Sequence, residues 1–432
     1  MNLMQSIDFL INQLLREPSI FLGIIVSLGM IFLKKKTHEI IISTIKTVVG
    51  IQIVQVGANS MVAATKPILD MIINRYGLEG RIADPWVGVG ESLDRMAGTQ
   101  LVSQIGFIMI SAWLIHLLFS RFSKLKVVYL SAHLMFSDTI LITFFTYAVT
   151  GWEDFRAILV SVLLLAGNWW FGPAIIAKPL KKIVGEEKIT LGHNLSLVGF
   201  VAIWIAKLTG DPSKETEGLN YPQWLSVMQD PVVSFTVVIS MMFLLIGILA
   251  GPEAGLSVSG AMNPIFFSFL QGVKVSVGII IIIAGVKMFQ VELIPAFEGF
   301  AKVVVPGAIP AVDAVVFWPY APQAAILGVL FTILGMVTGV FLQIVFGSAF
   351  VTIPGAIPII SGGFTLGVLT SRAGGIRGTI ISTYLLGIVH IFGSAWLAEI
   401  IGLQIAGGGH LDYCTFWPGI FYIIKIFAGQ IN

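Results

Sequence analysis

The sequence predicts an all-α polytopic membrane protein of about 11 transmembrane helices, with two inverted structural repeats and proline-broken helices or hairpins. Of its 432 residues, 56% are apolar and only 11% are charged, and the mean hydropathy is +0.94. Soluble domains carry roughly a quarter charged residues, so this chain lacks the polar surface that a soluble protein needs. The 25 basic and 23 acidic residues nearly cancel, which argues against nucleic acid as a partner.

Apolar stretches long enough to cross a bilayer run through most of the chain. A hydrocarbon core about 30 Å thick needs roughly 20 apolar residues per helix. The clearest candidates are residues 101–120, 127–149, 155–177, 232–251 and 273–291. Shorter or broken stretches, such as residues 19–33, raise the expected number of crossings to about ten or eleven.

Residues 303–322 are apolar but cannot form one continuous helix. They contain Pro306, Pro310, Pro319 and Pro322, and proline both removes a backbone donor and clashes with the preceding turn. Non-helical backbone survives at membrane depth only where protein or a wet cavity surrounds it. This segment is therefore a candidate part of a binding site.

Basic residues alternate between loops and predict an orientation. They occur at residues 34–36, at 121–126 two crossings later, and at 178–182 after two more, whereas the loop at 153–154 has no basic excess. The positive-inside rule places the three basic loops in the cytoplasm and the N-terminus outside. Trp169 and Trp170 predict an interfacial aromatic belt.

Two internal similarities point to repeats. Residues 50–56 (GIQIVQV) and 285–291 (GVKMFQV) share three of seven positions, although chance similarity between apolar helices is the alternative. Residues 305–310 and 353–358 both contain Pro-Gly-Ala-Ile-Pro. Secondary transporters are often built from inverted repeats whose broken helices meet at a midplane site, and a channel could share this feature.

A charged segment rich in helix breakers separates the two halves. Residues 210–218 (GDPSKETEG) predict a hydrated loop. We therefore divide the chain into a first membrane repeat (1–210), a polar linker (211–231), and a second membrane repeat with a C-terminal helix (232–432).

Asp313 is the strongest candidate for a binding side chain, because it lies among apolar residues shortly after Pro310. A buried carboxylate is costly without partners. The paired hydroxyls of a sugar suit it, since a carboxylate accepts strong charge-assisted hydrogen bonds. An ion pair with Lys302 or Lys287 is the alternative.

Three further polar positions carry two interpretations each. His133 lies in or at the end of an apolar span, and either lines a substrate cavity or is satisfied by a neighbouring helix. The pair His193-Asn194 opens a span and is either a cavity group or a solvated cap. Glu292 is either a second cavity acid or the partner of Lys287.

Several common chemistries have no sequence signal. The chain has neither a Walker motif for nucleotide hydrolysis nor His, Cys and Glu at metal-site spacings. The sequence thus predicts no cofactor and no metal. The single cysteine, Cys414, allows no intrachain disulfide.

A set of motifs occurs in one order over nearly the whole chain: Asp94-Arg95-Met96, residues 133–136 (HLMF), Gly192-His193, residues 287–297 (KMFQVELIPAF) and residues 306–323 (PGAIPAVDAVVFWPYAPQ). Together they resemble the membrane subunit (enzyme IIC) of ascorbate-type permeases. These permeases belong to the ascorbate–galactitol superfamily of the bacterial phosphoenolpyruvate-dependent phosphotransferase system.

The resemblance implies a homodimer in the bacterial inner membrane, in contact with lipid, with a dimerising domain and a moving core domain. Each protomer would carry one sugar or sugar acid inward by an elevator-like shift. A cytoplasmic IIB partner, phosphorylated on cysteine, would then phosphorylate the sugar. No catalytic residue is expected on this chain, so whether it counts as an enzyme is left open. The residues around Cys414 do not match those around a phosphorylated IIB cysteine, and no soluble domain is expected after residue 432. Both observations fit a stand-alone IIC subunit.

The resemblance also implies where the sugar binds: at His193, Asn194 and Asp313, at Ser137, four residues after His133, and in the stretches 55–60 and 84–86, from which we select Asn59, Ser60 and Trp86. His133 and, as a second acid, Glu292 complete the predicted site on the interpretation of the polar positions given above. The family pattern has glutamine where this chain has Asn194 and Ser137, and tyrosine where it has Trp86. Shorter side chains change which polar groups of a solute can be paired. The expected solute is therefore ascorbate or a related small sugar or polyol.

Two other function classes compete with this interpretation. An ion-coupled secondary transporter would use Asp313 and Glu292 as coupling sites and concentrate unmodified solute. A passive channel or membrane scaffold would show no saturable uptake.

Overall fold

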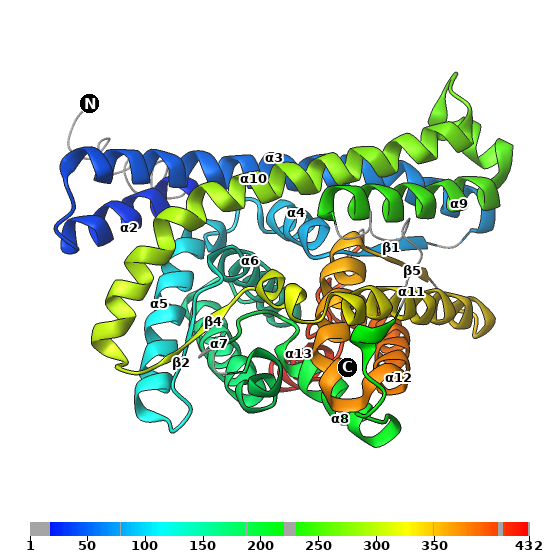
Figure 1. Ribbon diagram of the computed structural model, residues 1–432. Helices are drawn as coiled ribbons and strands as arrows, with labels where there is room; N and C mark the ends of the chain where they lie inside the picture. Colours follow the sequence, from blue (N-terminus) through cyan, green and yellow to red (C-terminus); the bar gives the residue numbers. More distant parts are fainter. Residues whose placement is uncertain are drawn as a thin grey trace, which may run out of the picture.

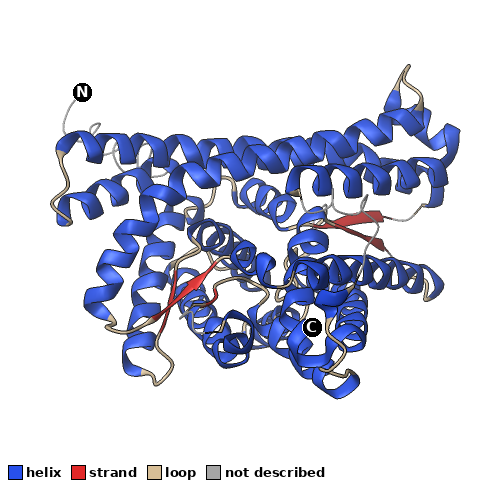
Figure 2. Ribbon diagram, viewed as in Figure 1, coloured by secondary structure: helices blue, strands red, loops and turns tan. Residues whose placement is uncertain are grey.

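The computed structural model in Figure 1 describes residues 18–77, 79–185, 189–219, 230–348, 350–404 and 409–430. It is mostly helical with a few short strands (Figure 2). Within the described residues, eight helices are long and apolar enough to cross a membrane. The prediction of an all-α polytopic membrane protein is thereby confirmed.

The long helices are α3 (Thr37–Tyr76), α5 (Leu101–Phe122), α6 (Ala132–Thr150), α7 (Phe155–Val184), α9 (Pro231–Ser259), α10 (Pro264–Val304), α11 (Pro322–Val345) and α12 (Gly363–Ile401). The shorter helices are α2 (Pro18–Phe32), α4 (Pro85–Met96), α8 (Ser196–Thr209) and α13 (Trp417–Phe427). In Figure 1, α2, α3, α9 and α10 form an elongated layer, and the remaining long helices pack along one side of it.

Helices α3 and α10 cross at glycines that face each other. A Cβ on Gly50 would lie 2.7 Å from the carbonyl oxygen of Gly285, and a Cβ on Gly285 would lie 2.5 Å from that of Gly50. A Cβ on Gly57 would likewise lie 2.7 Å from the carbonyl oxygen of Gly278. Small residues let helix backbones approach closely inside a membrane. Gly50 and Gly285 are the first residues of the two similar segments found in the sequence.

In the described part of the chain, five short strands form two parallel sheets. Strand β1 (Glu79–Ala83) pairs with β5 (Phe350–Pro354), and β4 (Ile309–Val312) pairs with both β2 (Val127–Tyr129) and β3 (Thr190–Leu191). Every pair joins a strand from the first half of the chain to one from the second. The pairing gives backbone groups of these non-helical segments partners within the protein.

The proline-rich segment is broken as predicted. Helix α10 ends at Val304, β4 follows, and a 3₁₀ helix η4 (Ala314–Tyr320) precedes α11. The second Pro-Gly-Ala-Ile-Pro segment leads from β5 into a π-helical turn, η5 (Pro358–Gly362), at the start of α12. The predicted span over residues 127–149 is wrong at its start, because its first three residues pair with β4 as strand β2.

The linker between the halves is more than a hydrated loop. Side chains from residues 211 to 215 are exposed, as expected. The backbone, however, docks on α12 where that helix breaks at Gly375 (φ 57°): Asp211 N donates to Gly374 O at 2.9 Å, and Ile376 N donates to Lys214 O at 2.9 Å. A break leaves peptide groups without helical partners, and the linker supplies them. Residues 220–229 lie outside the described residues.

A second linker contact caps α11. Glu217, in the 3₁₀ turn η2 (Thr216–Gly218), accepts hydrogen bonds from Ala324 N at 3.0 Å and Gln323 N at 3.3 Å. These amides belong to the first turn of α11, where helical N–H groups have no partner of their own.

Candidate functional site

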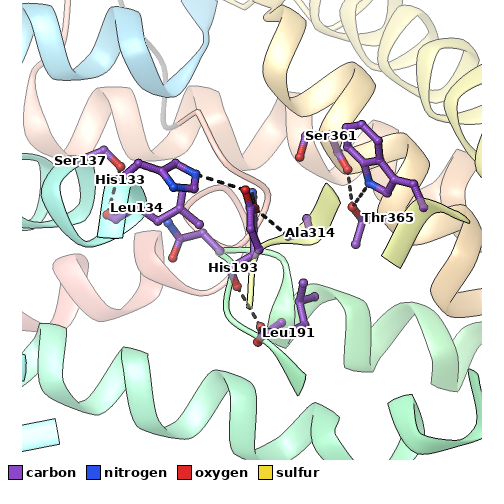
Figure 3. Close-up of polar contacts among 12 residues, drawn as sticks. His133, Leu134, Ser137, Leu191, His193, Ala314, Ser361 and Thr365 are labelled. Atoms are coloured by element: carbon purple, nitrogen blue, oxygen red, sulfur yellow. Dashed lines mark hydrogen bonds and ion pairs between the residues drawn. The ribbon is translucent and has the colours of Figure 1, made fainter. Parts of the chain in front are cut away.

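The parallel strands β2, β4 and β3 bring three predicted site residues to one edge of a sheet. His133 follows β2 at the start of α6, Asp313 follows β4 directly, and His193 lies two residues after β3. Carboxyl ends of parallel strands meet at the same edge. Segments that are 60 to 180 residues apart along the chain thus place two imidazoles and a carboxylate together (Figure 3).

Asp313 lies between the two histidines. His133 Nε2 is 3.5 Å from Asp313 Oδ2, and His193 Nε2 is 4.0 Å from Asp313 Oδ1. Both separations exceed an ordinary N–H···O bond of about 2.7–3.2 Å. Oδ1 also accepts from Ala314 N at 2.6 Å, which caps η4. A carboxylate offers about four acceptor positions, so Asp313 keeps capacity for further donors.

The structure does not support Lys287 as the partner of Asp313. Lys287 is exposed on α10, and the ionisable side chains beside Asp313 in the described part of the chain are His133 and His193. The side chain of Lys302 lies outside the described residues. The Asp313 side chain is 20% exposed, so it is not sealed in a dry interior.

Each histidine ring keeps one nitrogen without a partner. The side chains of His133 and His193 are only 13% and 4% exposed, and their Nδ1 atoms are buried with no hydrogen-bond partner in the described residues. Such atoms are uncommon in a protein interior and call for an explanation. A hydroxyl group can satisfy either protonation form of a ring nitrogen, since it both donates and accepts.

Asn194 lies beside this cluster but is bound to the protein. Its Nδ2 donates to Asp138 Oδ1 at 2.5 Å, and its Oδ1 accepts from Asn168 Nδ2 at 3.2 Å. Ser137, on α6, is buried and donates to the backbone carbonyl of Leu134 at 3.1 Å.

Trp86 belongs to the other sheet. It is buried in the first turn of α4, directly after β1, and its backbone N–H donates to Asp84 Oδ1 at 3.0 Å. Asp84 also accepts from Ile357 N at 3.4 Å, which follows β5. Trp86 is therefore at the end of the β1–β5 pair and not at the edge where Asp313 lies.

The three remaining predicted residues lie on the long α3–α10 layer. Asn59 is exposed and Ser60 half-buried on α3. Glu292, on α10, accepts from Ser43 Oγ at 2.6 Å and pairs with Lys46 Nζ at 3.0 Å. Lys287 is not the charged partner of Glu292 in these contacts, because that partner is Lys46 on α3.

Sequence reasoning missed a set of buried polar residues around the cluster: Asp138, Trp169, His410, Asp412 and Tyr413. Trp169 is fully buried, so the aromatic-belt interpretation is wrong for it. An acid inside an apolar span is the signal that identified Asp313, and it also applies to Asp138. His410, Asp412 and Tyr413 lie between α12 and α13 and carry no comparable signal.

A cavity of about 560 Å³ lies elsewhere, between α3, β1 and the end of α12. Its charged lining residues are Lys66, Asp70, Glu79, Arg81 and Glu399. None of the predicted site residues lines it. Within the described residues, no group of three or more His, Cys, Asp and Glu side chains is placed to hold a metal ion.

Comparison with known proteins gives two matches. The sequence model of the EIIC-GAT family, described as the sugar-specific permease component of the PTS system, matches residues 13–413. The chain is also 23% identical over 433 residues to the ascorbate-specific PTS system EIIC component of Mycoplasma pneumoniae. That alignment covers 88% of this chain and 65% of the relative, so the chain spans slightly less than two thirds of the relative's length.

Proposed function

We propose a transport function for this chain, which belongs to the EIIC-GAT family of sugar-specific permease components of the phosphotransferase system. It binds ascorbate or a related small sugar or polyol between His133, His193 and Asp313 and carries it into the cell. The observation that carries this proposal is the carboxylate held between two imidazoles at the joint edge of three strands. Sugar hydroxyls donate to a carboxylate and exchange hydrogen bonds with imidazole.

The exact solute depends on which amides reach it. Asn194 and Ser137 stand where the family pattern has glutamine, and both make hydrogen bonds within the protein. With fewer side-chain amides to match, the site would accept ascorbate or another compact polyhydroxyl compound. Trp86, Asn59 and Ser60 would reach the solute only if the layer that carries them moves relative to the Asp313 cluster.

Transport would proceed by an elevator-like shift of a core relative to a dimerising layer. His133, His193 and Asp313 follow strands of one small sheet, so they would move as a unit. The reciprocal contact of Gly50 with Gly285 and the strand pairing between halves support two inverted repeats, residues 1–210 and 232–432, joined by the linker 211–231. We expect a homodimer with about eleven crossings per protomer.

The phosphoryl group would come from a cytoplasmic IIB protein phosphorylated on cysteine. Cys414 is buried and 1% exposed, which disfavours it as a carrier that must meet a soluble donor. Exposed lysines at residues 34–36, 124, 126 and 181–182 would face the cytoplasm, with the N-terminus outside.

Uptake into proteoliposomes tests this function. With phosphoenolpyruvate and the soluble phosphotransferase proteins inside, the solute should accumulate as its phosphate, and omitting any of them should abolish accumulation. Accumulation of unmodified solute under a proton or sodium gradient would instead support the ion-coupled alternative. The pairing of Glu292 with Lys46 offers that alternative little support, because one of its two proposed coupling acids already has an ion-pair partner.

A further inference from the structure

Asp138 joins the segments that carry the candidate sugar site. It lies on α6, five residues after His133, and its side chain is fully buried. Its Oδ1 accepts hydrogen bonds from Asn194 Nδ2 at 2.5 Å and from the Tyr413 hydroxyl at 2.8 Å, and its Oδ2 accepts from Trp169 Nε1 at 3.0 Å. The three donors come from three separate parts of the chain.

Two of these donors belong to segments that hold or contact His193. Asn194 follows His193 directly. Tyr413 is three residues after His410, whose ring packs edge-on against His193 with centroids 4.9 Å apart. Asp138 thereby ties the helix of His133 to the loop of His193 and to the segment that packs on it.

The third donor has a different position. Trp169 comes from the middle of α7, and its ring stacks on Tyr129 with centroids 5.8 Å apart. It binds the other carboxylate oxygen and is not adjacent in sequence to any histidine of the site. It therefore offers a control for the loss of one hydrogen bond to the same carboxylate.

The contacts of Asn194 explain how the link reaches His193. Both ends of its carboxamide are engaged, by Asp138 and by Asn168, and its backbone carbonyl accepts from Asp412 N at 3.1 Å. Asp412 in turn accepts from Val198 N at 2.8 Å in the first turn of α8. The His193 loop is thus fixed on its C-terminal side by contacts with Asp138, Asn168 and Asp412.

A buried carboxylate is an expensive way to fill an apolar interior. A fully bonded polar network, by contrast, specifies one geometry, and binding groups need such support to stay within about 0.5 Å of their working positions. The two histidines stand 3.5 and 4.0 Å from Asp313, so a small displacement would change which hydroxyls they can reach.

We propose that Asp138 is a positioning residue of the sugar site, holding His133 and His193 in the arrangement that recognises a polyhydroxyl solute through its hydrogen bonds to Asn194 and Tyr413. This role rests on the proposed function. It also assigns Asn194 to fixing the loop, with recognition left to the histidines and Asp313.

Calorimetric titration of the purified full chain tests the proposal, with the tightest binder from a panel of ascorbate, hexitols and aldoses as the probe. Asp138→Asn keeps the shape of the side chain but puts an NH2 group where donors of Asn194, Tyr413 or Trp169 need an acceptor. We expect the affinity for the solute to fall about tenfold or more. Trp169→Phe removes only the α7 donor and should change the affinity less than about threefold. The double variant Asp138→Asn/Asn194→Asp exchanges donor and acceptor and should recover most of the lost affinity.

Thermal melting of each variant separates positioning from general stability. Wild-type affinity in Asp138→Asn overturns the role. A double variant that binds no better than Asp138→Asn also overturns it. The same holds if Trp169→Phe loses as much affinity as Asp138→Asn and the loss in both variants is matched by an equal drop in melting temperature. If the folded wild type binds no member of the panel, the proposed function itself is refuted. If the wild type and Asp138→Asn bind equally well, only the positioning role is refuted.

Discussion

Asp313 differs from Asp138, Asp412 and Glu292 in what surrounds it. The described acids Asp138, Asp412 and Glu292 each accept at least two hydrogen bonds or ion pairs from the protein at 3.2 Å or less. Asp313 has one short bond, from the next residue, and two more distant imidazoles. Among these four acids, Asp313 is the one with capacity left for a ligand.

Replacing Asp313 with asparagine should weaken sugar binding about tenfold to a hundredfold, because hydrogen bonds to a charged group contribute roughly 1.5–3 kcal/mol. Glu292→Gln is the matched control and should leave affinity unchanged, since Glu292 pairs with Lys46 on α3. Thermal-shift titration of both variants measures the difference. Equal losses in the two variants would contradict the distinction.

His193→Ala should abolish detectable binding while the protein stays folded in detergent and elutes from a size-exclusion column like the wild type. The ring makes no hydrogen bond among those described, and its 4.0 Å approach to Asp313 is longer than one, so its removal breaks no hydrogen bond of the fold. Size-exclusion chromatography and titration on the same sample provide the measurement. Wild-type affinity would remove His193 from the site.

The sequence allowed this cluster to be predicted because an imidazole or carboxylate in an apolar run is costly without a purpose. The sequence could not indicate which of these polar side chains already have hydrogen-bond or ion-pair partners within the protein. Asn194 and Glu292 look as available in the sequence as Asp313, and only the tertiary structure reveals Asp138 and Lys46 as their partners.

At the scale of elements, the crossing of α3 and α10 depends on glycine. Gly285→Ala should destabilise the protein by about 1–3 kcal/mol, because the new methyl would meet the Gly50 carbonyl and the Val54 amide, neither of which can move freely. Gly167→Ala on α7 is the control: a Cβ there meets no atom within 4 Å, and alanine favours a helix by up to about 1 kcal/mol. A Gly285→Ala variant that melts like Gly167→Ala would refute close packing at this crossing.

The linker provides a second test at this scale. Glu217→Ala should lower stability by about 1 kcal/mol, because two amides in the first turn of α11 lose their acceptor. Glu215→Ala, two residues earlier, removes only an exposed contact 3.9 Å from Arg372 and should melt like wild type. Indistinguishable melting curves for the two variants would exclude Glu217 as a helix cap.

Element boundaries were predictable where proline fixed them and not where tertiary pairing did. Four prolines predicted the break between α10 and α11. Strand β2 looked like the start of a span because Val127–Tyr129 is as apolar as the helix after it. Its strand conformation comes from pairing with β4, nearly two hundred residues away in sequence.

For the whole molecule, the proposed orientation can be tested with the low cysteine background. Cys414 is buried, so a membrane-impermeant thiol reagent should not label the native chain. Lys124→Cys should react only from the cytoplasmic side and Glu153→Cys only from outside, since both positions are exposed on loops at opposite ends of predicted spans. Labelling of both from the same side would contradict the orientation.

The most direct test of the whole account is a structure of the full chain in lipid with the transported sugar bound. We predict sugar density between His133, His193 and Asp313, with a hydroxyl within hydrogen-bond distance of the Asp313 carboxylate. Sugar found instead in the cavity lined by Lys66, Asp70 and Arg81, with the histidine–aspartate cluster empty, would contradict it.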